Sequence, residues 1–358
     1  MTPSSPNQTP HSLGFRMPAE WDPHEATWLG WPHEITDWPG KFATIPWAFA
    51  EIVRHLSQVE RVYLLVENRE AESRVRAILK KSGANLAAVE FFRIPTDRGW
   101  MRDSGPIGVT NSSGEVAYTN WRFNGWAKYG NHKKDALVVA SANKKLQRRV
   151  WLPEHNGRRI VLEGGSIDVN GRGTLLTTEE CLLSHTQERN PGFTRETYAE
   201  VFKNYLGATH VLWLKNGIAG DDTHGHVDDL ARFVDPTTVV TVVEEDSNDA
   251  NFASLQENLA ILKSARDQDG RPLRVETLPM PAPVYFDGQR LPASYANFYI
   301  ANKIVLVPTF NDPNDRVAMN TLAELFPSRK IVGIPCRDLV LGLGTIHCMT
   351  QQQPGSQP

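Results

Sequence analysis

A repeated order of polar clusters, strands and helices is the feature that most constrains how this chain can fold. Four predicted β-hairpins are each preceded directly by a cluster of polar residues, and the clusters recur roughly every 60 to 70 residues. The clusters are WMRDSGP (100–106), LEGGS (162–166), HGHVDD (224–229) and SYANF (294–298). Repeats arranged about an axis in a closed ring would bring all four clusters together. An α/β protein without internal symmetry is the alternative, because residue similarity among the repeats is slight.

Hydrophobic periodicity predicts helices that alternate with strands. Apolar residues at three- and four-residue steps predict helices over 46–57, 70–81, 134–148, 195–205, 253–265 and 313–326. Strand-like runs lie between them, and the turn formers SSG, NGRG, DPTT and NK separate the paired runs of the four hairpins. No linker or shift in composition divides the chain. We therefore predict a single α/β domain over 16–352, with flexible tails at 1–15 and 353–358.

Composition indicates a globular protein that acts on a small molecule. Of the 358 residues 40% are hydrophobic, and 38 basic and 41 acidic residues leave a formal charge of -3. Because these charges are well mixed, we expect neither a nucleic acid nor a membrane as partner. Three cysteines without a CxxC spacing argue against a disulfide framework and a structural zinc site, and the N-terminus lacks the pattern of a secretory signal. We expect a cytoplasmic protein.

One cysteine lies where a thiol can react. Cys348 occurs in LGLGTIHCMTQQQP, where two glycines allow an unusual backbone path and His347 adjoins the thiol. A catalytic cysteine acts as a thiolate, so it needs a cationic neighbour or a cationic substrate. The alternative for a lone cysteine is a small buried apolar residue, and that description suits Cys181 and Cys336.

The cluster HGHVDD places two histidines beside two carboxylates. In an extended segment His224, His226 and Asp228 would share one face. Such a set can provide an acid/base histidine next to a carboxylate that binds a cation. It also resembles the H-x-H-x-D ligand set of metallo-β-lactamase-type hydrolases, although no second histidine-rich motif follows. A polar loop before a strand is the third interpretation.

The other clusters carry side chains that suit a planar cation. Asp103 can stabilise its own turn, or it can face a shared cavity and accept hydrogen bonds from the cation, with Trp100 as an aromatic wall. Glu163 has the same two interpretations, and Asn297 can contact a substrate or satisfy neighbouring backbone groups. The chain contains no G-x-S-x-G, P-loop or dinucleotide-binding motif.

Taken together, these motifs resemble those of the agmatine deiminase and bacterial peptidylarginine deiminase family. The resemblance spans residues 17 to about 352 and rests, in this order, on MPAEWDPHEATWLGWPH, WMRDSGP, LEGGSIDVNGRGTLLTTEECLLS, GHVDD, ASYANFYIANKIVLVP and GTIHCMTQQ. It implies the guanidine-modifying pentein fold, a five-bladed pseudo-symmetric α/β propeller with an axial active site. It also implies that no cofactor or metal takes part, and it suggests a homodimer.

The resemblance also implies roles for individual residues. Asp103 and Asp228 would hold the guanidinium group of a substrate. His226 would transfer protons, and Cys348 would attack. The further residues that we expect to bind substrate are Glu163, Trp100 and Asn297.

The implied reaction is hydrolytic deimination through a covalent cysteine thiouronium intermediate. Agmatine, converted to N-carbamoylputrescine and ammonia, is the substrate we expect first, and peptidyl arginine or another small guanidino compound is the alternative. A metal-dependent hydrolase and a catalytically silent binding propeller are the alternatives from other classes.

Some positions depart from the family's pattern. Leu343 and Thr345 stand where the pattern GGGNIHC has Gly and Asn, and Asp229 stands where an Asn is usual. The string FNGWAKYG, which contains Trp126, replaces FNAWGG. We expect these changes to leave the chemistry intact and to affect recognition of the substrate's tail.

Overall fold

The computed structural model describes residues 8–355, and over this range the strands form five sheets built on one plan, together with two small hairpins. In each sheet a first strand pairs antiparallel with a second, and a third strand lies parallel to the second. Four sheets follow one another along the chain: β4 (Ile107–Thr110), β5 (Val116–Thr119) and β6 (Val150–Trp151); β9 (Asp168–Val169), β10 (Thr174–Thr178) and β11 (His210–Leu214); β12 (Ala231–Asp235), β13 (Thr238–Val243) and β14 (Arg274–Pro279); β17 (Tyr299–Ile300), β18 (Ile304–Thr309) and β19 (Lys330–Pro335).

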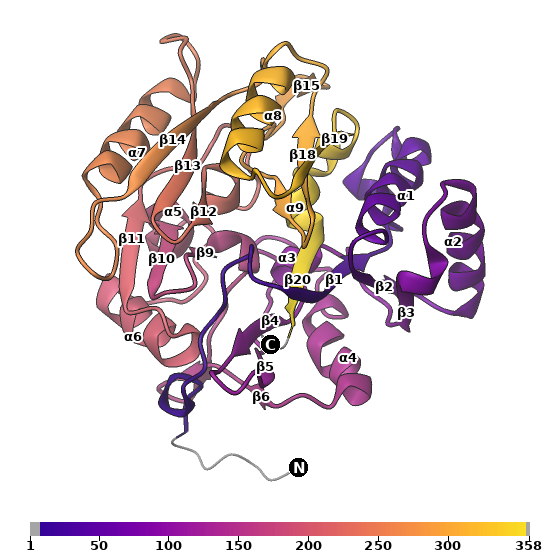
Figure 1. Cartoon of the computed structure of the whole chain (residues 1–358), viewed down its shortest axis with the longest axis horizontal. Coiled ribbons are helices and arrows are strands. Elements are labelled where there is room, and N and C mark those ends of the chain that lie inside the picture. The colour runs from indigo at the N-terminus through magenta and orange to yellow at the C-terminus, as the bar shows by residue number, and fades with distance from the viewer. Residues whose placement is uncertain (1–7, 356–358) are drawn as a thin grey trace.

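A helix leads from the second strand of each sheet to the third and lies on the rim of the molecule (Figure 1). These helices are α1 (Ile45–Leu56), α4 (Val138–Leu146), α6 (Arg195–Leu206), α7 (Phe252–Ser264) and α8 (Asn314–Leu325). In addition, α2 (Arg69–Lys81) leads to β3 (Val89–Arg93), and β3 lies parallel to β2 (Arg61–Val66). All the predicted helices are confirmed to within a few residues.

Local signals determine where these helices begin and end. The side chains of Asn68 and Thr194 each accept a hydrogen bond from a backbone N–H in the first turn of α2 and α6. At the other end of α6, Gly207 has a φ of 69°, a left-handed conformation that glycine adopts without steric cost.

The fifth sheet joins the two ends of the chain. Its first strand, β20 (Thr350–Pro354), pairs antiparallel with β1 (His24–Gly30), and β1 lies parallel to β2. The ring is therefore closed by hydrogen bonds between segments that are far apart in sequence, and β1 and β20 lie side by side near its centre (Figure 1).

The predicted tails are wrong where the structure describes them. Gln353 and Pro354 are buried in β20, because the side chain of Gln353 accepts hydrogen bonds from Trp28 and Tyr118. At the other end, Phe15 is buried against Trp151. The remainder of the predicted tails, residues 1–7 and 356–358, lies outside the described residues.

Four short helical turns and one irregular segment directly precede the first strands of the five sheets. The turns are α3 (Met101–Ser104), η6 (Gly164–Ser166), η7 (Val227–Asp229) and α9 (Ile346–Met349), and the segment is 294–298. They converge, because α3 contacts both η6 and α9, and η6 contacts η7. The four polar clusters thus meet as predicted, and α9 with Cys348 is a fifth member of the same series.

Within the described residues, no helix is both long enough and apolar enough to cross a membrane.

Candidate active site

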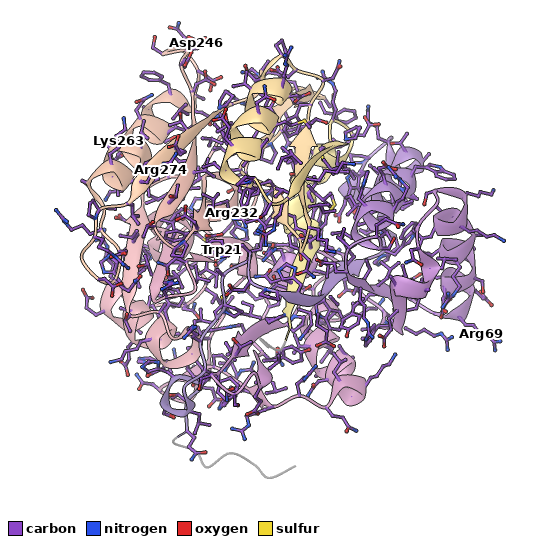
Figure 2. All side chains as sticks on the ribbon, viewed as in Figure 1. Trp21, Arg69, Arg232, Asp246, Lys263 and Arg274 are labelled. Carbon is purple, nitrogen blue, oxygen red and sulfur yellow. The ribbon has the colours of Figure 1, made fainter. Side chains whose placement is uncertain are left out.

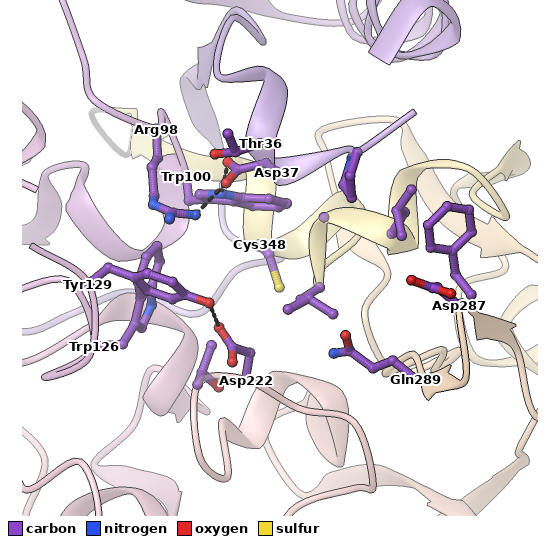
Figure 3. A pocket seen from close by; sticks show the side chains of 16 residues that line it. Thr36, Asp37, Arg98, Trp100, Trp126, Tyr129, Asp222, Asp287, Gln289 and Cys348 are labelled. Carbon is purple, nitrogen blue, oxygen red and sulfur yellow. Dashed lines mark hydrogen bonds and ion pairs between the residues drawn. The ribbon is translucent and has the colours of Figure 1, made fainter. Parts of the chain in front are cut away.

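A cavity of about 470 Å³ opens above the point where the turns converge. The Sγ atom of Cys348 points into it, with the rings of Trp100 and Trp126 on its sides (Figure 3). Further out the lining is formed by Thr36, Asp37, Pro39, Arg98, Tyr129, Asp222, Thr223, Phe286, Asp287, Gln289, Leu341, Gly342 and Leu343. The predicted nucleophile therefore has an access route, although its residue is only 6% exposed.

The turn that carries Cys348 is held by Asn297. The Oδ1 atom of Asn297 accepts hydrogen bonds from the Thr345 hydroxyl at 2.7 Å and from the His347 backbone N–H at 3.0 Å. Its Nδ2 group donates to the Cys348 sulfur at 3.1 Å and to Asp229 Oδ1 at 3.0 Å. Both hydrogens of Nδ2 are engaged within the protein. The geometry therefore favours a role for Asn297 in positioning the thiol, rather than the contact with substrate that we expected.

Glycine beside the nucleophile keeps the approach to the sulfur open. A Cβ atom on Gly344 would lie 3.0 Å from the Trp100 ring and 3.2 Å from Cys348 Sγ. The preceding residue, Leu343, has a φ of 66°, which directs the chain into this narrow passage. The Trp100 ring packs on Trp38 with ring centroids 5.6 Å apart, and its Nε1 donates to Asp37 at 3.1 Å. Trp100 is thus a fixed wall of the cavity, as expected.

The two carboxylates expected to bind a cation both lie near enough to Cys348 for their charge to act on its thiol. Asp103 Oδ1 accepts a hydrogen bond from the Gly165 N–H at 3.0 Å, and Oδ2 accepts one from Trp126 Nε1 at 2.8 Å. Asp228 Oδ2 lies 3.7 Å from Cys348 Sγ and 2.6 Å from His347 Nδ1. Asp228 Oδ1 is buried and has no hydrogen-bond partner among residues 8–355.

Burial and neighbouring charge act differently on these two carboxyl groups. Burial raises the pKa of Asp103 to about 6. Burial also opposes ionisation of Asp228, but the hydrogen bond and charge of His347 outweigh it, so the pKa of Asp228 is lowered. Asp228 is therefore the carboxylate that stays ionised over the wider pH range.

His226 lies between two acids. Its Nδ1 is 3.9 Å from Asp103 Oδ1 and its Nε2 is 3.8 Å from Glu163 Oε2, and in the described part of the chain neither ring nitrogen has a hydrogen-bond partner. Burial alone would lower the pKa of His226, but the charge of Asp103 and the contacts with Cys181 and Glu163 raise it well above 6.5. These neighbours therefore favour the protonated form of the ring.

Glu163 contacts His226, and these two residues, together with Asp103 and Asp228, lie below the residues that line the cavity. Its Oε1 accepts a hydrogen bond from Arg189 Nε at 3.1 Å. Burial opposes ionisation of Glu163, but the charge of Arg189 and the contact with His226 lower its pKa to about 2. The geometry therefore places a permanent carboxylate against the histidine, rather than the direct substrate contact that the sequence suggested.

The predicted H-x-H-x-D metal ligand set does not form. The segment is not extended, because His224 and Gly225 have φ values of 65° and 88° and the next residues form the η7 turn. The His224 ring lies 3.1 Å from the Ser184 hydroxyl. Among the described residues, the groups with metal-ligand spacing are Glu163, Cys181 and His226, and Asp228, Asp229 and Cys348, and neither includes His224.

Sequence reasoning missed several residues of the site. His347 was noted only as a neighbour of the thiol, and Trp126 only as a departure from a pattern. Arg189, which fixes Glu163, lies in QERNP and carries no local signal. Asp229 is fully buried beside the thiol, and burial together with the charge of Asp228 raises its pKa well above the ordinary value.

This chain is similar to known deiminases over nearly its whole length. Residues 16–354 match the Porphyromonas-type peptidyl-arginine deiminase family. The agmatine deiminase of Pseudomonas aeruginosa (strain LESB58) is 36% identical over 373 residues, which cover 98% of each chain. The solved structure of the agmatine deiminase of Enterococcus faecalis matches with a TM-score of 0.90 and 32% identity, over 99% of each chain.

A more distant likeness concerns the fold alone. An amidinotransferase from Microseira wollei matches with a TM-score of 0.50 and 11% identity, over 96% of this chain and 98% of the other. The predicted α/β pentein fold is confirmed by these likenesses. With a full-length family match and relatives above 30% identity, this chain belongs to the family of Porphyromonas-type peptidyl-arginine deiminases and agmatine deiminases.

Proposed function

We propose that this chain is an agmatine deiminase, which hydrolyses the guanidinium group of agmatine to N-carbamoylputrescine and ammonia. The observation that carries this proposal is a buried thiol flanked by the carboxyl groups of Asp103 and Asp228, with Asp228 Oδ1 unpaired within the described structure. A planar cation with several N–H donors would neutralise the negative charge of the carboxylates and donate a hydrogen bond to the free oxygen of Asp228. The relatives with full-length similarity that carry this activity in their names support it.

In the first half of the reaction the substrate itself activates the nucleophile. Its cation offsets the carboxylates that hold Cys348 protonated, so the thiol proton leaves to solvent and the thiolate attacks the central guanidinium carbon. This forms a C–S bond and a tetrahedral adduct. His226 then gives a proton to one NH₂ group, the C–N bond breaks, and ammonia departs to leave a cationic thiouronium.

In the second half His226, now neutral, removes a proton from water. The resulting hydroxide attacks the thiouronium carbon, and collapse of the adduct breaks the C–S bond and returns the thiolate. The proton of the new hydroxyl passes to solvent, where the ammonia released earlier takes up a proton to become ammonium. The ionised Glu163 behind the ring favours recovery of the imidazolium at this step.

The outer cavity favours a substrate tail that carries an amine and no carboxylate. Arg98, a cation of the lining, is already paired with Asp37. Lys128 near the mouth is paired with Asp222. Asp287 is exposed at the mouth, opposite Cys348 (Figure 3). Agmatine presents an ammonium group at this end, which suits the carboxylate of Asp287. Free arginine adds a carboxylate, and the two nearby cations, Arg98 and Lys128, are already paired with Asp37 and Asp222.

The test is the release of ammonia from agmatine, arginine, a blocked peptidyl arginine and smaller guanidino acids, with and without EDTA. We expect turnover of agmatine that EDTA does not affect, no turnover by Cys348→Ala, and a KM for agmatine raised about tenfold or less in Asp287→Asn. A preference for peptidyl arginine would show that peptidyl arginine, and not agmatine, is the substrate. Inhibition by EDTA would favour the metal-dependent alternative. Full activity of Cys348→Ala would contradict the mechanism.

Two further expectations belong to this proposal. The three cysteines are unpaired, which supports a location in the reducing cytoplasm. The family resemblance supports a homodimer.

A further inference from the structure

The histidine next to the nucleophile lies between two carboxylates. His347 is 1% exposed, and its Nδ1 is 2.6 Å from Asp228 Oδ2 while its Nε2 is 2.8 Å from Glu20 Oε2. Both distances are those of hydrogen bonds. A neutral imidazole has only one N–H, so it can donate only one of them, whereas an imidazolium donates both.

Glu20 is itself fixed by two arginines from other blades. Its Oε2 accepts a hydrogen bond from Arg102 Nη2 at 3.0 Å, and its Oε1 lies 2.9 Å from Arg232 Nη2. Arg232 also pairs with Asp168, at 2.5 Å. Figure 2 shows Arg232 near the centre of the molecule, whereas Arg69 lies on the rim.

The network contains three carboxylates and three bases, all buried, and it reaches the nucleophile's neighbour from the N-terminal segment: Asp228, Glu20, Asp168, His347, Arg102 and Arg232. Two arginines balance only two of the three negative charges. A buried charge without a partner is costly, and an imidazolium hydrogen-bonded to both Asp228 and Glu20 would supply the third positive charge of this network.

The two oxygen atoms of the Asp228 carboxylate differ in their contacts. Its Oδ2 is held by His347, while Oδ1 is left without a partner within residues 8–355. We propose that His347 is a positioning residue, an imidazolium anchored by Glu20 that keeps Asp228 ionised and turns its free oxygen toward the substrate. This inference rests on the proposed function for its substrate, but the hydrogen bonds of His347 are made within the protein and do not depend on which guanidine binds.

The first test uses the substrate-free enzyme and does not depend on turnover. Because each ring nitrogen lies at hydrogen-bond distance from a carboxylate oxygen, we expect NMR of ¹⁵N-histidine-labelled protein at neutral pH to show a hydrogen on both ring nitrogens of His347. The resonance is identified by its loss in His347→Gln. A hydrogen on only one ring nitrogen would overturn the proposal whatever the substrate proves to be.

The second test is kinetic and uses His347→Gln, which keeps an N–H donor and removes the charge. The groups that face His347 or the carboxylate it holds, and that can affect its pH profile, are Asp228, Glu20, Arg102, Arg232, His226, Asp229 and Cys348. In the unmodified enzyme Asp103, with a pKa of about 6, governs the acid limb of kcat/KM. In His347→Gln the cation that favours ionised Asp228 is gone, so we expect the ionisation of Asp228 to enter this limb, which becomes steeper and moves to higher pH. We also expect KM for the guanidine to rise at least about tenfold at neutral pH.

Two variants separate positioning from a loss of folding. Glu20→Gln leaves His347 in place but removes its anchor, so it should move the acid limb in the same direction by a smaller amount. His55→Gln is the control, because His55 is a half-buried histidine of α1 that pairs with Glu51 at 3.1 Å and makes no hydrogen bond to any group of the network. It should lower thermal stability without moving the acid limb.

The outcomes distinguish this inference from the proposed function. If the unmodified enzyme hydrolyses no guanidine, the proposed function fails, and the NMR result still decides the charge of His347. If the enzyme is active and both network variants keep its pH profile and its KM, the positioning role is refuted.

Discussion

Three carboxyl groups, those of Asp103, Asp228 and Asp229, surround the thiol of Cys348. Burial, together with their charge, raises the pKa of this thiol well above 9.0. A raised pKa disfavours the thiolate at neutral pH. Under the proposed mechanism the thiolate forms as the cationic substrate enters, so we expect the thiol to resist alkylation and oxidation at other times.

Removal of one of these charges leads to a prediction at the scale of a residue. In Asp228→Asn a negative neighbour is lost, so the pKa of the Cys348 thiol falls and more thiolate exists at a given pH. We expect iodoacetamide to alkylate Cys348 about tenfold faster than in the unmodified enzyme near pH 8, while agmatine turnover falls at least about 100-fold.

Labelling followed by mass spectrometry measures this reactivity, with Cys348→Ser giving the background from the two other thiols. An alkylation rate that is unchanged or lower in Asp228→Asn would show that the carboxylate does not control the thiol.

Among the elements, the turn that carries the nucleophile depends on a residue without a side chain. Gly344 precedes α9, and a Cβ atom there would meet Trp100 and the Cβ of Cys348, each at 3.0 Å. Contacts this short require the thiol or the indole ring to move. Since Asn297 and Trp38 hold these two groups, the movement would displace the sulfur from the substrate carbon.

Gly344→Ala is accordingly expected to lower kcat/KM for agmatine about 100-fold, because a displacement of this size is costly for an aligned reaction. The free energy of unfolding, measured with urea, should change by no more than about 1 to 3 kcal/mol. Gly130→Ala is the matched control, since a Cβ there would meet nothing within 4 Å. Equal kcat/KM in the two variants would mean that the passage beside Gly344 is wider than the structure shows.

For the whole molecule, closure of the ring by β20 is the decisive interaction. This strand pairs with β1 and is buried along its length. It also brings Gln352 to Arg102 Nη1, at 2.7 Å, and so connects the C-terminal segment to the central network. Without β20 the strand β1 would lie at an open edge of its sheet. The turn with Cys348 would also no longer be anchored by the strand that follows it.

A chain that ends at Met349 is therefore expected not to fold, whereas a chain that ends at Gly355 retains all of β20 and should fold. Circular dichroism during heating is the measurement, and we expect a cooperative transition only for the longer chain. A cooperative transition of the shorter chain at a similar temperature would show that the other four sheets suffice for stability.

Much of this protein could be predicted from its sequence because the relevant signals are local. Periodic apolar residues predicted the helices, since each helix buries one face whatever it packs against. The polar clusters before the hairpins predicted where Asp103, His226 and Asp228 would meet, because a polar group that precedes a buried strand lies at the end of its sheet. Cys348 was found through its own motif.

Other features were decided only by the tertiary structure. The end of strand β20, Gln353 and Pro354, was predicted as a tail, because its partner β1 lies at the other end of the chain and no turn between them marks a hairpin. His347 and Glu20 gained a shared role only when closure of the ring brought them within 2.8 Å. The physical reason is common to both: apolar periodicity and turn chemistry act between neighbours in sequence, whereas pairing and buried charge act between neighbours in space.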